Sequence, residues 1–218
     1  MKNHWRLAVL FALAGAAGLF TNGCASSNNS SLAVPHDDLA DFRKVAQQAR
    51  MAFERASFSL DQVAASGNSC PPPVVASYKK AVGDLEVIAV QARSRAQAII
   101  ARGDAYFEDW EDHVEKVQSL RAQALMEERR PQLQETFNRL KDACAQTHGA
   151  FQPFLTGLRE VRTVLENSPD SISTEPNQNL IHNTQVHGRD VALCVDSVRK
   201  NLDDLAEQVR EIKVASRH

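Results

Sequence analysis

Cys24 is the residue with the clearest chemistry in this chain, because it directly follows a segment built like an export leader. Met1–Arg6 is short and basic, and Leu7–Phe20 is an uncharged stretch of fourteen residues. A membrane-spanning helix needs about 20 apolar residues, so this stretch fits the core of a signal peptide better. The pattern predicts a lipoprotein signal peptide over residues 1–23. The Cys24 thiol would be acylated and would hold the protein on a membrane.

The residues around the cleavage site leave a second interpretation open. Gly23 suits lipoprotein cleavage, whereas Thr21 stands where an aliphatic residue is usual. The alternative is ordinary secretion, with cleavage after Ala25. Both interpretations place the chain outside the cytoplasm. By similarity to lipoproteins of Gram-negative bacteria, Ala25 in place of an aspartate favours the outer membrane, facing the periplasm.

Three further cysteines could form a disulfide in such an oxidising compartment. We predict a Cys144–Cys194 bond; the alternative is that Cys144 is a small core residue. Cys70 would then be a leftover thiol that could link two copies of the chain. The cysteine spacing does not match a zinc site, and we expect neither a metal nor a cofactor.

The stretch from Tyr106 to His113 concentrates aromatic and acidic residues. One interpretation is a partner or cation site in which Tyr106, Phe107 and Trp110, together with the Cys70 loop, contact a partner. The alternative is a buried aromatic cluster with a solvated acidic face. The charged run from Glu127 to Arg130 is interpreted as solvent-exposed.

No other pattern points to a reaction. The sequence has no Ser, His and Asp arrangement and no phosphate-binding glycine loop, so we expect no enzymatic activity; a cell-wall hydrolase would need an acid and a base paired in a cleft. Without residues 1–23, the chain carries 23 basic against 27 acidic side chains. That balance argues against nucleic acid as a partner.

The elements that must position these residues are predicted to be helices. Apolar residues recur at alternating steps of three and four, a spacing that keeps one apolar face against partner helices. Four such runs cover Leu39–Val63, Tyr78–Leu120, Leu133–Leu165 and Ile181–Ile212. The pattern predicts an all-α fold, an elongated antiparallel coiled coil or bundle of three to four long helices.

The expected organisation is a flexible tether over residues 24–35 followed by one helical domain over residues 36–218. Its helices are predicted at about 37–66, 74–129, 132–167 and 177–216. At Pro131 the sequence allows a kink within one long helix or a reversal of the chain, and we favour the reversal.

The middle of the chain resembles a bacterial family described as domain of unknown function 2959, whose members are often envelope lipoproteins with long helices. The resemblance covers about Tyr78 to Leu165. It is carried by Phe107-Glu108-Asp109-Trp110, Leu120-Arg121, the spacing from Leu133 to Leu140, and Pro153-Phe154-Leu155 before Leu158. It implies a fold and a location but no activity.

These observations together favour a membrane-anchored envelope lipoprotein that serves as a non-enzymatic spacer or protein-interaction module. Its partners would be the membrane, through the N-terminal lipid, and an envelope protein or a second copy. The alternative is a carrier that binds an apolar ligand or lipid between helices. Small residues such as Ala89 and Ala92 on the apolar face argue against a wide cavity there.

Overall fold

The computed structural model describes residues 36–215, and these residues form helices joined by short turns. No strand occurs within this range, so the all-helical prediction is confirmed for it. Cys24, the predicted leader and the predicted tether lie outside the described residues. In chain order the elements are α1 His36–Ala64, α2 Pro72–Glu108, α3 Trp110–Glu115, α4 Leu120–Asn167, the 3-10 helix η1 Pro169–Ser171 and α5 Glu175–Ala215.

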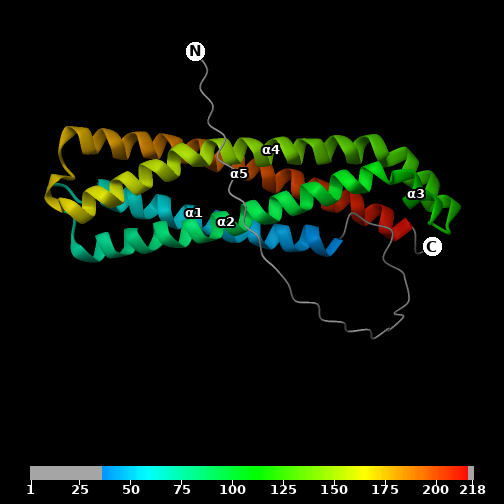
Figure 1. Cartoon of the computed structure of the whole chain (residues 1–218), viewed down its shortest axis with the longest axis horizontal. Helices are drawn as coiled ribbons and strands as arrows, with labels where there is room; N and C mark the ends of the chain where they lie inside the picture. The colour runs from blue at the N-terminus through cyan, green and yellow to red at the C-terminus, as the bar shows by residue number, and fades with distance from the viewer. Residues whose placement is uncertain (1–35, 216–218) are drawn as a thin grey trace, which may run out of the picture.

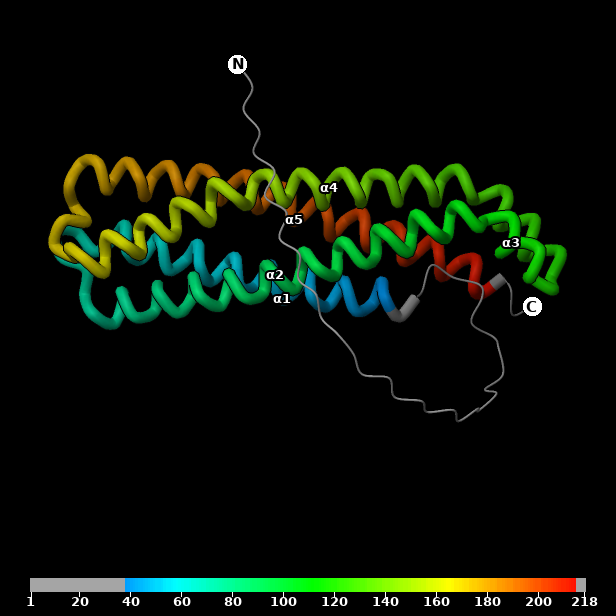
Figure 2. Tube along the Cα trace, in the orientation of Figure 1, coloured from blue at the N-terminus to red at the C-terminus, as the bar shows by residue number. Residues whose placement is uncertain are grey.

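Helices α1, α2, α4 and α5 lie side by side in an elongated body (Figure 1). The turn between α1 and α2 and the turn between α4 and α5 meet at one end, where the Ser69 hydroxyl donates to Asp170 Oδ1 at 2.9 Å. The short helix α3 lies at the opposite end, and α1 stops short of it (Figure 2).

Local sequence explains where α1 ends and α2 begins. Gly67 has φ +67°, a left-handed conformation that glycine adopts without strain and that ends a helix. Pro71 is extended, at φ −60° and ψ 140°, and Pro72 then occupies the first helical position. Proline suits that position because its missing N–H would have no partner there.

Glycines allow two pairs of helices to approach closely. Gly103 of α2 faces the ring of Phe137 in α4, and a Cβ at residue 103 would overlap that ring. Gly157 of α4 faces Thr184 of α5 in the same way. These contacts hold α4 against both of its long neighbours with little space between the backbones.

The reversal that the sequence placed at Pro131 occurs earlier, so that prediction is wrong. Helix α2 ends at Glu108 rather than near residue 129, and α4 starts at Leu120 and continues through Pro131. The turn is closed by side chains: Ser119 caps α4 by accepting from the Ala122 amide, and the Gln123 side chain donates to backbone carbonyls of the preceding turn. Pro131 is exposed, so water can reach the carbonyl that its ring leaves unbonded.

Arg129 explains why the sequence pattern broke down in this region. The buried face of α4 runs through Ala122, Met126 and Leu133, and the three-four spacing places Arg129 between the last two. Because Arg129 interrupts the row of apolar residues, the apolar spacing did not predict that one helix continues through this region. By contrast, Leu120, which the sequence assigned to the apolar run, is 80% exposed.

Candidate functional site

The aromatic cluster around Trp110 is the densest group of interacting side chains that the sequence singled out. Trp110 is the first residue of α3 and is fully buried, at 0% exposure. Its Nε1 donates to Glu127 Oε1 of α4 at 3.1 Å. The Phe107 ring lies parallel to the indole, with centroids 5.8 Å apart, and also contacts Phe137 at 5.5 Å. The cluster therefore joins α2, α3 and α4 where the chain reverses.

Tyr106 and His113 form the second half of this cluster. Their rings stack with centroids 4.6 Å apart, and Tyr106 meets the Trp110 ring edge-on at 5.6 Å. Burial raises the pKa of Tyr106 to about 12, so its hydroxyl stays neutral at any physiological pH. Nδ1 of His113 is buried without a hydrogen-bond partner.

Charged side chains cover the outside of the cluster. Arg130 of α4 bonds Glu111 of α3 at 2.5 Å, and its guanidinium lies 5.6 Å from the Trp110 ring centroid. A cation over an aromatic face is attracted by the ring's electron density. Glu111 thus pairs with Arg130, and Glu127 accepts a hydrogen bond from Trp110. These contacts stabilise the reversal of the chain.

The residues predicted to contact a partner are mostly inside the protein. Trp110 and Tyr106 are buried, Phe107 is half-buried, and Cys70 is 4% exposed. Of the two interpretations that the sequence left open for the aromatic stretch, this placement matches the buried cluster. In the charged run from Glu127 to Arg130, interpreted as solvent-exposed, Glu127 and Glu128 are exposed, and Glu127 and Arg130 also contact Trp110 and Glu111. Sequence spacing held no signal for these contacts, because they form between helices.

The cysteines lie apart from one another. Cys70, Cys144 and Cys194 are free thiols, so the predicted bond between the last two is not made. Cys144 is one turn from Lys141, which binds Asp104 of α2 at 2.6 Å, so its face of α4 turns toward α2 rather than α5. Burial raises the pKa of the Cys144 thiol to about 11. Cys70 packs in the core with its Sγ 3.6 Å from the Ser66 hydroxyl, so its thiol is not exposed at the surface, where the predicted link between two copies would need it.

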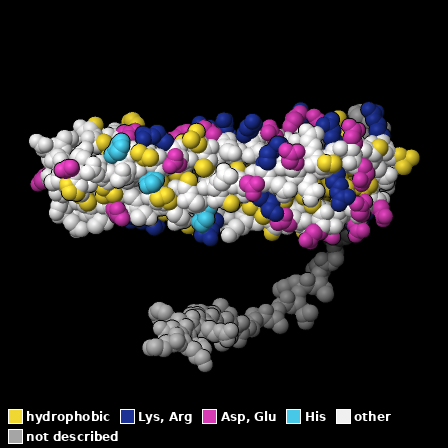
Figure 3. All heavy atoms as spheres, turned by 90° about the horizontal axis from the view of Figure 1, so that it is seen from above, with side chains coloured by type: hydrophobic (Ala, Val, Ile, Leu, Met, Phe, Trp, Pro, Cys, Tyr) yellow, Lys and Arg dark blue, Asp and Glu magenta, His cyan; other side chains and the backbone are white. Residues whose placement is uncertain are grey.

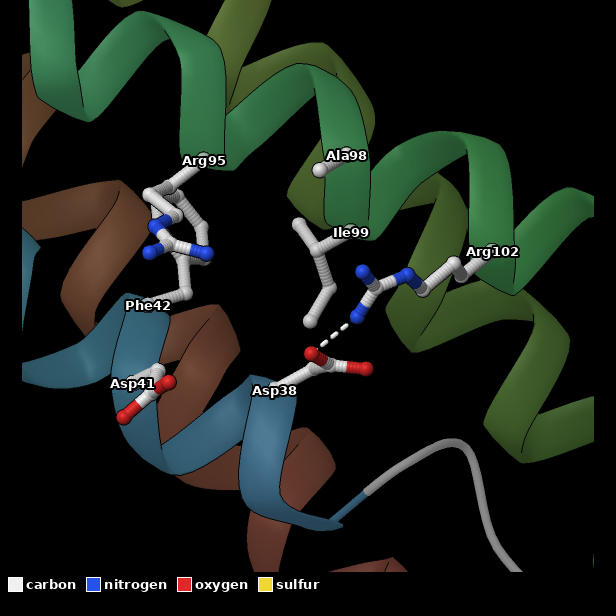
Figure 4. Close-up of a pocket in the computed structure, with 7 residues that line it drawn as sticks. All are labelled: Asp38, Asp41, Phe42, Arg95, Ala98, Ile99 and Arg102. Atoms are coloured by element: carbon white, nitrogen blue, oxygen red, sulfur yellow. Dashed lines mark ion pairs between the residues drawn. The ribbon is translucent and has the colours of Figure 1, made fainter. Parts of the chain in front are cut away.

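A small hollow opens between α1 and α2. Figure 4 shows Arg95 and Arg102 reaching from α2 toward Asp41 and Asp38 of α1, and Arg102 pairs with Asp38. Its floor is closed by the buried side chains of Phe42 and Ile99. The positive and negative groups balance, so the hollow has no strong preference for a charged ligand.

Comparisons with known proteins identify no relative of this chain. No family model, no curated protein and no solved structure matches the chain. Within residues 36–215, no group of three or more His, Cys, Asp or Glu side chains is arranged to hold a metal ion. None of the helices in this range combines the length and the apolar character needed to cross a membrane.

Proposed function

We propose that this chain is a lipid-anchored protein of the bacterial cell envelope that acts as a non-enzymatic spacer or protein-interaction module. In this proposal the four long helices form an elongated antiparallel bundle that projects from the membrane. The proposal is carried by an elongated helical body that follows, in the sequence, a segment with the pattern of an export leader over residues 1–23 and then Cys24. The segment from Tyr78 to Leu165, which resembles a family of envelope lipoproteins with long helices although no family model matches the chain, favours the same role.

The anchor would be the acylated N-terminal Cys24, with residues 24–35 linking it to α1. Each buried methylene adds about 0.8 kcal/mol, so several acyl chains would hold the protein stably. Ala25, which stands in place of an aspartate, favours the outer membrane, facing the periplasm, as the location. The end at which the two turns meet lies away from the start of α1, so it would be the end far from the membrane (Figure 1).

The surface supports binding to protein rather than to nucleic acid. Acidic and basic side chains alternate along the face in Figure 3, with apolar side chains between them. Phe58 and Leu193 expose 63% and 72% of their surface. The interior holds bulky packed side chains near both ends, such as Tyr78 and Trp110, which supports a spacer more than a carrier.

Metabolic labelling with an alkyne fatty acid tests the anchor. In a Gram-negative host, the wild-type chain should take up the label and fractionate with the outer membrane, and Cys24→Ser should lose both properties. Cys194→Ser is the matched control, because it removes a thiol from the helical body and should keep the label. Equal labelling of wild type and Cys24→Ser would refute the anchor.

Site-specific photo-crosslinking in cells tests the interaction role. A photoreactive residue at Phe58 or Leu193 should capture one defined envelope protein or a second copy, whereas one at the buried Tyr78 should capture nothing. A stoichiometric lipid in the purified protein, detected by mass spectrometry, would favour the carrier instead.

A further inference from the structure

The buried core is divided into two separate parts along the body. One cluster includes Trp110, Phe137 and Leu202, and the other includes Tyr78, Phe154 and Ile181. Between them lies a segment of each long helix in which no side chain is buried. We call these four segments together the waist: residues 47–51 of α1, 89–95 of α2, 145–149 of α4 and 196–197 of α5.

Contacts between helices show that the four segments lie at the same position along the length of the helical body. Arg50 of α1 pairs with Asp196 of α5 at 3.4 Å within the waist itself. Helices α2 and α4 are joined on either side of it, by Asp104 with Lys141 and by Glu86 with Arg159, both at 2.6 Å. Helices α4 and α5 are likewise joined on either side, by Thr136 with Gln208 at 3.1 Å and by Gly157 with Thr184.

Side chains at the waist contribute little to packing. The positions that face inward carry small groups, such as Ala49, Ala92 and Thr147, and these remain half-buried. Bulky apolar side chains at or beside this level point outward instead: Val90 is 70% exposed and Leu193 72%. Segments that bury few apolar contacts open at lower free energy than the rest of a fold.

The backbone of α4 is weakened beside the same level. Pro153 has no N–H to donate to the carbonyl of Gly149 one turn earlier. Glycine at that position adds backbone freedom, and a Cβ there would meet no neighbour within 4 Å. Figure 2 shows α4 changing direction between its green and yellow stretches.

We propose that the waist is a joint at which the two halves of the helical body bend relative to each other while each core stays packed. Three separate observations meet there: the break in the core, the outward-facing bulky side chains, and the missing helix hydrogen bond in α4. On a tethered protein, such a joint would let the far half reorient without unfolding. The inference concerns the helical body alone and does not depend on the lipid anchor.

Hydrogen–deuterium exchange of residues 24–218 without any substitution, followed by mass spectrometry, tests the joint. Peptides covering residues 89–95 and 145–152 should exchange at least about tenfold faster than peptides from either core. Exchange at the same rate as in the two cores would overturn the proposal.

Two variants refine the test. Ala92→Leu fills the waist and Pro153→Ala restores the α4 hydrogen bond, so each should slow exchange at the waist at least about threefold and leave the two cores unchanged. Ala101→Leu, at an exposed position of α2, is the matched control and should change neither. Faster exchange at the waist that neither Ala92→Leu nor Pro153→Ala slows would also overturn the proposal.

Discussion

Gly157 and Thr184 lie so close together that the side chain of one occupies the space where a Cβ of the other would lie. The Thr184 hydroxyl is already oriented by its hydrogen bond to the Leu180 carbonyl, at 2.7 Å, and it is buried. The contact therefore sets the distance between α4 and α5 near the end where the two turns meet.

Gly157→Ala should destabilise the protein, although alanine favours a helix more than glycine does. Overpacking a core typically costs about 1–3 kcal/mol, and the helix preference returns about 1 kcal/mol. We expect a net loss of up to about 2 kcal/mol in the free energy of unfolding, measured with urea. Gly83→Ala is the matched control, because a Cβ there meets nothing within 4 Å, and it should stabilise α2 by up to about 1 kcal/mol. Thr184→Ala should recover much of the loss in the double variant; no recovery would contradict the contact.

Trp110 should report on the reversal at α3 by fluorescence. Trp5 lies in the predicted leader, so a chain starting at Cys24 has Trp110 as its single tryptophan. Its burial predicts blue-shifted emission that moves to the red on unfolding. Trp110→Ala should cost about 3–5 kcal/mol, because it removes a large core side chain. Glu127→Ala leaves the indole N–H without its partner and should cost less, about 1 kcal/mol. Red-shifted emission from the folded protein would contradict this placement.

Glu86 should make stability depend on pH. Partial burial alone would raise the pKa of this carboxyl, but the hydrogen bond from Arg159 and the charge of Arg162 together lower it. A lowered pKa in the folded state means that the contribution is present above the ordinary glutamate pKa of about 4.3 and is lost as pH falls below it.

The free energy of unfolding should therefore differ between wild type and Glu86→Gln at pH 7, by about 1 kcal/mol or less given the partial exposure, and the difference should shrink as pH falls through the lowered pKa of Glu86. The exposed Glu108→Gln is the control and should follow wild type. A difference that grows as pH falls would contradict the assigned direction.

Periodicity was enough to predict helices over most of the described chain, because apolar spacing alone decides which face of a helix is buried. It could not predict the reversal before Ser119, since that turn is closed by Gln123 and Ser119 rather than by glycine or proline. The cysteine pairing failed for a related reason. Cys144 and Cys194 lie on facing helices, but the rotation of α4 turns Cys144 toward α2, and rotation is set by contacts such as Lys141 with Asp104.

A substitution at Arg129 tests whether this residue lies on the apolar face of α4. It occupies a position on the apolar face, where its Nε is buried without a hydrogen-bond partner, while Nη1 donates to Gln132 Oε1 at 3.0 Å and Nη2 reaches Glu211 at 3.6 Å. Burying a polar group without a partner costs free energy that an apolar side chain would not lose. Arg129→Leu should therefore stabilise the protein, by about 1 kcal/mol in urea unfolding. Arg121→Leu is the matched control at an exposed position of the same helix and should have little effect. Destabilisation by Arg129→Leu, with no effect of Arg121→Leu, would mean that the contacts of Arg129 with Glu211 and Gln132 outweigh the cost of its buried donor.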